Sequence, residues 1–203
     1  MTADIQSQPI PVRFEHLLRV VCSDRFLKKE GLGNEVPFFI CPYKAQEAVD
    51  MEKTQRDLVV QLRNRGVRIL ALNLYDLCLD LLGQREILDQ VLESEADLSR
   101  DELLELLQSV LDPEKHLIPA IAAKMAEAEF DVLFLSGVGE VFPYLRSHNV
   151  LNNLQRVAKE QPTLLFFPGE YTHSLEGGAS LDLFGKLRDD KYYRAFNIYH
   201  CEA

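Results

Sequence analysis

The stretch FLSGVGEVFPYLRSHNVLNNLQRVAKEQPTLLFFPGEY, from Phe134 to Tyr171, decides the fold. Two short apolar runs, Val132 to Leu135 and Thr163 to Phe167, each end at a turn that contains glycine. Between them, Val141 to Lys159 has helical spacing with Pro143 in its first turn, so the stretch predicts a β-α-β unit. In a parallel sheet such turns lie at the carboxyl ends of adjacent strands, where open α/β proteins bind ligands or partners.

Apolar runs and helical segments alternate on both sides of this unit. Val36 to Cys41 predicts a first strand, and Val67 to Leu74 predicts a second strand with enough apolar residues to be buried on both faces. The same patterns predict four further elements. They are helices over residues 11–27 and 44–65, a short helix around residues 181–187 and a fifth strand over residues 193–200.

Between the second and third strands, residues 75–129 give no strand signal and contain clusters of leucine. Ser99 followed three residues later by Glu102 is a capping box, and Asp112 with Pro113 opens another helix. The segment therefore predicts an insertion of three or four helices. The fold expected for residues 1–203 is a single α/β domain with three layers, a mostly parallel five-stranded sheet and this all-helical insertion.

Charge is distributed unevenly along the chain. Residues 75–131 carry 15 acidic and 4 basic side chains, a net charge of −11, whereas the remaining residues have a net charge of +1. An isoelectric point near 5.0 argues against direct nucleic-acid binding, because that binding needs a basic surface. The acidic surface of the insertion is expected to be either a solvated face or a dock for a partner.

The chain lacks signals for membranes and for disulfide bonds. No apolar run reaches the roughly 20 residues needed to span a bilayer, and the start from Met1 to Pro11 is polar. The 4 cysteines are spread without a C-x-x-C pair, which favours a reduced protein over a disulfide framework or a zinc site. Together these features predict a soluble, cytoplasmic protein with no membrane partner.

The motifs of nucleotide hydrolases are incomplete. The Walker A pattern G-x-x-x-x-G-K-[ST] fails at Gly185-Lys186, because Ser180 stands at its first glycine and Leu187 at its hydroxyl residue. The first strand is followed by CPYK at residues 41–44, which offers no glycine, and the third by Ser136-Gly137 where an acid would hold magnesium. The sheet is therefore expected to resemble a P-loop or RecA-like core without Walker motifs, catalytic residues or a cofactor.

Other chemistries have little support. The G-x-G at residues 137–139 has Phe142 where a dinucleotide site needs its third glycine. His148 and His173, both near the predicted carboxyl edge of the sheet, are the remaining pair for ligand or acid-base roles, and no histidine spacing predicts a metal site. Cys41 is more simply a packed residue at a strand end than a nucleophile.

Two surface segments remain as candidates for a partner interface. The first is a predicted loop from Phe167 to Gly178, and the second runs from Asp189 to Arg194. Tyrosine and arginine often anchor protein interfaces, and the alternative is that one tyrosine of each pair packs inward. The candidate interface residues are Arg146, His148, Glu170, Tyr171, Asp189, Asp190, Tyr192, Tyr193 and Arg194.

Four motifs give the chain a resemblance to a known family. RSHNVLNNL from Arg146, FFPGEY from Phe166, LFGKLRDDKYYRAFNI from Leu183 and GLGNEVPFFI from Gly31 resemble the BrxB family of BREX (bacteriophage exclusion) systems. The resemblance implies a small component of a multiprotein antiphage defence system. Such systems also contain a DNA methyltransferase, a large ATPase and the alkaline-phosphatase-like protein PglZ. The resemblance implies no established catalytic residue.

The leading hypothesis is a non-catalytic assembly or adaptor subunit that binds another BREX protein, with the PglZ-like component as the expected partner. Its interface would comprise Ser136 to Arg146 and Phe167 to Tyr171 at the sheet edge. The alternative is a nucleotide- or nucleic-acid-binding regulatory module without hydrolysis. Its phosphate contacts would be Arg146, His148, Lys186 and Arg194. A third hypothesis, a metal-dependent hydrolase, would use His148 and His173.

Overall fold

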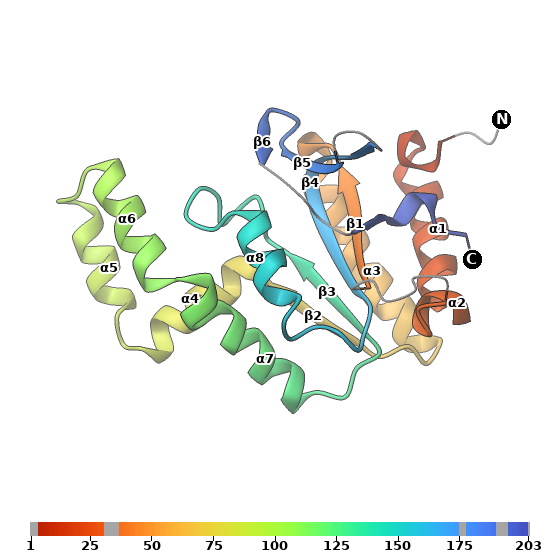
Figure 1. The fold of residues 1–203 in the computed structure, drawn as a ribbon, viewed down its shortest axis with the longest axis horizontal. Coiled ribbons are helices and arrows are strands. Elements are labelled where there is room, and N and C mark those ends of the chain that lie inside the picture. Colours follow the sequence, from red (N-terminus) through yellow and green to blue (C-terminus); the bar gives the residue numbers. More distant parts are fainter. Residues whose placement is uncertain (1–3, 31–36, 175–177, 190–194, 203) are drawn as a thin grey trace.

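The computed structural model describes residues 4–30, 37–174, 178–189 and 195–202, and Figure 1 shows their arrangement. The strands are β1 (Phe38–Tyr43), β2 (Ile69–Asn73), β3 (Val132–Ser136), β4 (Thr163–Ser174), β5 (Gly178–Leu183), β6 (Leu187–Asp189) and β7 (Phe196–Asn197). Five of them pair in parallel in the order β2-β3-β4-β1-β7. The antiparallel strands β5 and β6 continue from β4, so the described sheet has seven strands where the sequence predicts five.

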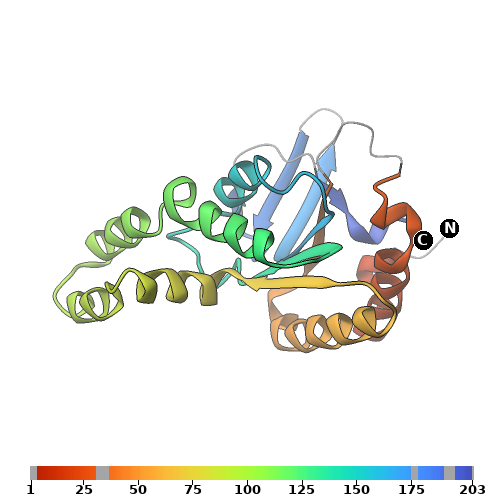
Figure 2. The ribbon, with the colours of Figure 1, turned by 90° about the horizontal axis from the view of Figure 1, so that it is seen from below.

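Helices cover both faces of the sheet (Figure 2). Helices α1 (Ile10–Cys22) and α3 (Ala48–Asn64) pack on one face, and α4 (Leu74–Gln84), α7 (Ile118–Glu127) and α8 (Ser147–Leu154) pack on the other. The remaining described helices are α2 (Asp24–Leu27), α5 (Leu88–Glu95), α6 (Arg100–Val110) and the short turns η1 (Ile5–Ser7), η2 (Ala45–Glu47), η3 (Pro113–Leu117) and η4 (Ile198–His200). The predicted α/β class with a mostly parallel sheet is therefore confirmed.

The two cores follow from the alternation of side chains along the central strands. In β1, Phe38 and Ile40 belong to the cluster with α4, α7 and α8, whereas Phe39 and Cys41 belong to the cluster with α1 and α3. Successive strand residues point to opposite faces, so a strand covered on both sides must be apolar throughout. In β3 the whole run from Val132 to Leu135 is 0% exposed. The continuous apolar runs therefore mark the centre of the sheet.

Strand β2 differs from the prediction that both of its faces are buried. Ile69 and Leu72 are buried, but Leu70 is half-buried and Ala71 is exposed. Among the described strands β2 pairs with β3 alone, so it lies at an edge. An apolar run shows that a strand is hydrophobic, and its place in the sheet decides how much of it the neighbours cover.

The largest correction concerns residues 167–189. The predicted loop from Phe167 to Gly178 is wrong in its first part, because β4 continues to Ser174 and pairs with β5. The short helix predicted around residues 181–187 is also wrong, since Leu181 to Leu183 lie in β5 and a turn leads into β6. Phe184 and Gly185 form this turn with positive φ angles of 56° and 68°. The alternation of buried Leu181, half-buried Asp182 and buried Leu183 has the period of a strand.

Two further elements are shorter than predicted. The helix expected from Val141 to Lys159 extends only over α8, and the segment before it contains a cis peptide bond between Phe142 and Pro143. The described part of the fifth strand is limited to β7, because η4 begins at Ile198. The Asn197 side chain accepts a hydrogen bond from the Tyr199 backbone N–H at 3.0 Å and so caps that turn.

The insertion between β2 and β3 is helical, as predicted, and comprises α4, α5, α6, η3 and α7. The capping box is confirmed: Ser99 Oγ accepts from the Glu102 backbone N–H at 3.4 Å, and Glu102 Oε2 accepts from the Ser99 backbone N–H at 2.9 Å. Asp112 caps the following turn through the Lys115 backbone N–H at 2.9 Å. Helices α5 and α6 with their connection, residues 88–110, form an arm that extends away from the sheet (Figures 1 and 2).

The helices of the described ranges all lack the combination of length and apolar character that a membrane-spanning helix needs. The longest of them, α3, is an amphipathic helix whose buried residues Met51, Thr54, Leu58 and Leu62 follow a spacing of three and four. Its other face carries charged side chains, so it packs on the sheet along one stripe.

Candidate partner interface at the carboxyl edge of the sheet

At the carboxyl end of β2, a side chain caps the next helix and lies against the turn that follows β3. Asn73 Oδ1 accepts hydrogen bonds from the backbone N–H groups of Tyr75 at 2.8 Å and Asp76 at 3.3 Å, at the start of α4. Gly137 follows β3 with a φ of 81°, and a Cβ atom there would lie 2.3 Å from Asn73 Oδ1. The glycine is therefore required both by its conformation and by the close approach of Asn73.

An ion pair between Arg13 and Glu47 lies near the end of β1. Arg13 is 2% exposed, and its Nη2 atom lies 2.6 Å from Glu47 Oε1. The other carboxylate oxygen of Glu47 accepts from the Lys44 backbone N–H at 3.1 Å. Burial acts to lower the pKa of Arg13, but the hydrogen bond and charge of Glu47, aided by Tyr199, outweigh it and raise that pKa. Arg13 thus stays charged and ties α1 to the chain that leaves β1.

Cys41 lies beside this ion pair and is fully buried. Its Sγ atom is 3.3 Å from the Tyr199 hydroxyl oxygen. Burial raises the pKa of the Cys41 thiol to about 12, while the hydrogen bond with Tyr199 and the charge of Arg13 act in the opposite direction. The thiolate is the nucleophilic form of cysteine, and a raised pKa keeps the Cys41 thiol protonated at neutral pH. Cys41 therefore acts as a packed side chain.

Tyr171 stabilises the fold rather than offering its ring to a partner. It is 7% exposed, and its hydroxyl group donates a hydrogen bond to the backbone oxygen of Ala195 at 2.5 Å. Inward packing was the alternative for one tyrosine of each pair, and Tyr171 follows it. The bond connects β4 to the segment that enters β7, across 24 residues of sequence. Tyr171 therefore offers little surface for a partner to contact.

A pocket of about 420 Å³ opens where β1 ends and the turn between β5 and β6 lies beside β4. Its charged lining includes Lys44, Glu170 and Lys186, all of which are exposed. Phe184 also lines it and is 39% exposed. A Cβ atom on Gly139 would lie 3.0 Å from the Phe184 ring, so the loop after β3 supports this aromatic side chain.

The structure separates the candidate interface residues. Glu170 lines the pocket, whereas Arg146 and His148 are not among its described lining residues. Arg146 is exposed just before α8, and His148 is half-buried in the first turn of that helix.

The second predicted segment is described only at its start. Asp189 ends β6, where its backbone pairs with Leu181, and its side chain lies outside the description. Asp190, Tyr192, Tyr193 and Arg194 lie outside the described residues. The same holds for the side chain of His173. Within the described ranges, no three histidine, cysteine, aspartate or glutamate side chains gather as metal ligands would.

Sequence reasoning missed Phe184 because a helix was predicted there. The signal that could have found it is the order LDLFGK over residues 181–186, in which two alternating leucines precede a glycine turn. An aromatic residue at the tip of a hairpin, next to glycine, is exposed for geometric reasons. Phe184 is therefore added to the candidate interface beside Glu170 and Lys186.

Comparison with known proteins confirms the resemblance. The BREX protein BrxB of Bacillus cereus (strain H3081.97) is 31% identical over 193 residues, which cover 92% of this chain and 95% of that protein. The BREX protein BrxB of Escherichia coli O9:H4 (strain HS) is 30% identical over 186 residues, which cover 92% and 90%. No solved structure matches the chain. The profile described as BREX protein BrxB matches residues 70–198, and the chain therefore belongs to the BrxB family.

Proposed function

We propose that this protein is a non-catalytic assembly subunit of a BREX phage-defence complex and that it binds the PglZ-like component. The observation that supports the proposal is that, at the carboxyl edge of the sheet, some side chains are bonded within the chain and others are exposed. Asn73, Glu47 and Tyr171 make hydrogen bonds within the chain. Beside them, Phe184 and Glu170 are exposed around a pocket. An exposed aromatic group with charges at its rim is the usual composition of a protein interface.

We further propose that the sheet is a RecA-like core that has lost nucleotide hydrolysis. The strand order supports this relation, because β4 lies between β1 and β3 as the corresponding strand does in RecA-like ATPases. At the position of a P-loop, β1 instead continues through Pro42, which pairs with Phe167, to Tyr43, which pairs with Pro168. Proline has no backbone N–H, so this segment offers fewer amide donors to a phosphate than a glycine-rich loop.

The proposal is tested by co-expressing the full chain with each protein of its BREX system and analysing the complexes by size-exclusion chromatography. We expect co-migration with the PglZ-like protein. Phe184→Ala should weaken that complex about tenfold, because an aromatic anchor would be truncated. Val60→Ala is the matched control, since Val60 is 55% exposed on α3 and should leave affinity unchanged. Migration as a lone species with every BREX protein would exclude the assembly role.

One observation favours the second hypothesis, a nucleotide- or nucleic-acid-binding module. Lys44, between β1 and η2, and Lys186, in the turn between β5 and β6, both line the pocket and are exposed. Of the four phosphate contacts predicted from the sequence, Lys186 is the one described at this pocket. Filter binding with nucleotides and DNA at low and moderate salt would decide, because phosphate binding weakens steeply as salt rises. No retention at low salt would exclude this role.

A further inference from the structure

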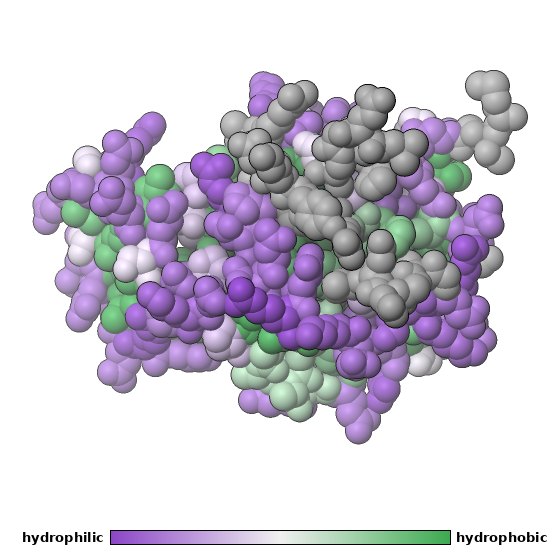
Figure 3. All heavy atoms as spheres, viewed as in Figure 1, coloured by the Kyte–Doolittle hydropathy of each residue, from purple (hydrophilic) through white to green (hydrophobic). Residues whose placement is uncertain are grey.

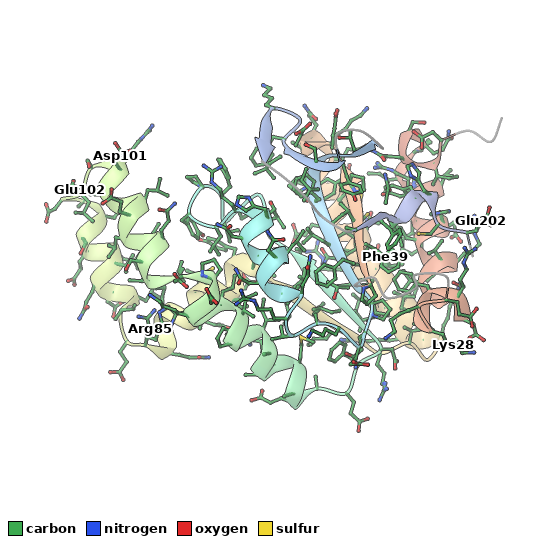
Figure 4. The ribbon with its side chains drawn as sticks, in the orientation of Figure 1. Lys28, Phe39, Arg85, Asp101, Glu102 and Glu202 are labelled. Atoms are coloured by element: carbon green, nitrogen blue, oxygen red, sulfur yellow. The ribbon has the colours of Figure 1, made fainter. Side chains whose placement is uncertain are left out.

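The helical arm, residues 88–110, is incompletely covered by the rest of the chain. Val91 is the buried residue of α5, and none of the eleven residues of α6 is buried. The base of the arm is attached to α4, where Arg85 Nη1 donates a hydrogen bond to the backbone oxygen of Val110. Figure 4 shows Arg85 at this base and Asp101 with Glu102 at the far end.

Both arm helices carry an apolar stripe that begins at the core and continues outward. In α6, Leu107 and Val110 pack against the core, and Leu103 lies four and seven residues before them on the same helical stripe. In α5, Leu88 packs against the core, and Leu92, one turn later, is 56% exposed. Among the described side chains, Leu103 and Leu104 are half-buried and do not belong to either core cluster.

The apolar stripe is visible on the surface of the arm. Figure 3 shows hydrophobic residues along the arm with hydrophilic residues on both sides of them. We call Leu92, Leu103 and Leu104 the arm leucines. An apolar strip between polar borders on exposed helices is typical of a surface that receives another helix.

The charge of the arm indicates what kind of helix fits. Residues 88–110 contain seven acidic side chains and one basic side chain, a net charge of −6. Asp89 and Glu95 lie three residues before and after Leu92, so the helical repeat places both of them beside it. Both carboxylates are exposed. A second copy of the arm would bring like charges together, whereas lysine or arginine side chains would complement them.

We propose that the arm is a docking surface for a basic amphipathic helix of a partner protein. The leucines of such a helix would cover the arm leucines, and its lysines or arginines would lie against Asp89 and Glu95. The inference rests on the proposed function, since an assembly subunit needs surfaces that hold other proteins. It adds a second surface to the pocket at Phe184 and names the chemistry of its occupant.

The test uses two synthetic peptides and the full-length chain. One peptide, about 18 residues long, contains leucine and lysine with the leucines at helical spacing, and the other has the same composition in an order without that spacing. Fluorescence anisotropy should show the periodic peptide binding at least about tenfold more tightly than the scrambled one. Equal binding of the two peptides would overturn the proposal.

Variants locate the site. Leu92→Ser with Leu103→Ser should weaken binding of the periodic peptide at least about tenfold, because it removes apolar contacts from both helices. The matched control is Val49→Ser with Val60→Ser, which changes two exposed apolar residues on α3 and should have no effect. Circular dichroism checks that both variants remain helical. An unchanged affinity in the arm variant, or an equal loss in the α3 variant, would place the peptide elsewhere and refute the proposal.

A third variant measures the electrostatic contribution to binding of the periodic peptide. Asp89→Asn with Glu95→Gln should weaken binding and reduce its dependence on salt concentration, because two carboxylates are neutralised without loss of apolar surface. An unchanged salt dependence would contradict the assignment of a basic partner. Since the probe is a peptide, failure here would leave co-migration with a BREX protein unaffected. Conversely, lone migration in that experiment would not alter the peptide result.

Discussion

Similar hydrophobic residues are buried in the centre of the sheet and partly exposed in the helical arm. Val132 to Leu135 of β3 are 0% exposed, because helices cover both faces and strands pair on both sides. In α6 a comparable set of leucines remains half-buried. The same residue type therefore stabilises the fold in one region and remains accessible in the other. The proposed partner would bind where the apolar pattern exceeds what the chain itself can cover.

The two regions also differ in charge. Arg68 immediately precedes β2, and Asp131 immediately precedes β3. The Arg68 guanidinium group contacts the Asp131 carboxylate at 2.8 and 3.1 Å, so this ion pair connects the starts of the two strands. In the arm, residues 88–110, acidic side chains outnumber basic ones by six. With seven acids and one base, most of these carboxylates cannot find a basic partner within the arm. The excess is consistent with attraction of a basic partner.

The largest expected effect comes from truncating a ring in the sheet. Phe166 is 2% exposed and packs against Phe134 in an edge-on geometry with ring centroids 5.3 Å apart. Phe166→Ala should lower the free energy of unfolding by about 3–5 kcal/mol, because it removes buried apolar surface and leaves a cavity. Leu92→Ala in the arm should change it by less than about 0.5 kcal/mol. Urea denaturation measures both. Similar losses in the two variants would remove the contrast between the regions.

An intermediate effect should be confined to the arm. Ser99→Ala removes the cap of α6 and should destabilise that helix by about 1 kcal/mol, or about fivefold in local opening. Amide hydrogen exchange should show faster exchange in α6 and unchanged exchange in β3 and β4. Ser109→Ala, in the last turn of the same helix, is the control and should have little effect. Equal acceleration in the central strands would mean that the arm and the sheet unfold together.

The smallest effect concerns the ion pair between Arg68 and Asp131, just before β2 and β3. The hydrogen bond from Arg68 lowers the pKa of Asp131 from its ordinary value of 3.8. A lowered folded-state pKa means that the pair stabilises the protein above pH 3.8 and that this contribution is lost as pH falls through the folded-state pKa. Asp131→Asn should therefore lower the urea midpoint slightly at neutral pH.

The pH profile provides the control for this pair. The difference between Asp131→Asn and the unchanged protein should shrink as pH falls below 3.8. Glu129→Gln is the matched variant, because the Glu129 carboxylate also contacts Arg68, at 2.8 Å, but its side chain is 91% exposed. It should have a smaller effect at every pH, since solvent and salt screen exposed ion pairs. A pH-independent difference for Asp131→Asn would assign its effect to packing instead.

Local patterns predicted much of this fold. The apolar runs located the strands of the parallel path, and the capping residues Ser99 and Asp112 located helix starts, because both signals depend on neighbours within a few residues. The hairpin of β5 and β6 was missed, since short alternating segments with leucine fit a helix or a strand equally well until a pairing strand is known. Tyr171 illustrates the same limit for the site: its burial depends on Ala195, far along the chain.

By itself, the sequence determined the alternation of helices and strands, the position of the helical insertion, the concentration of acidic residues there and the resemblance to the BrxB family. The tertiary structure decided that β2 is an edge strand, that Phe184 stands at a hairpin turn and that the arm leucines lie beyond the core. The physical reason is that periodicity is a property of adjacent residues, whereas burial depends on which distant segments cover them.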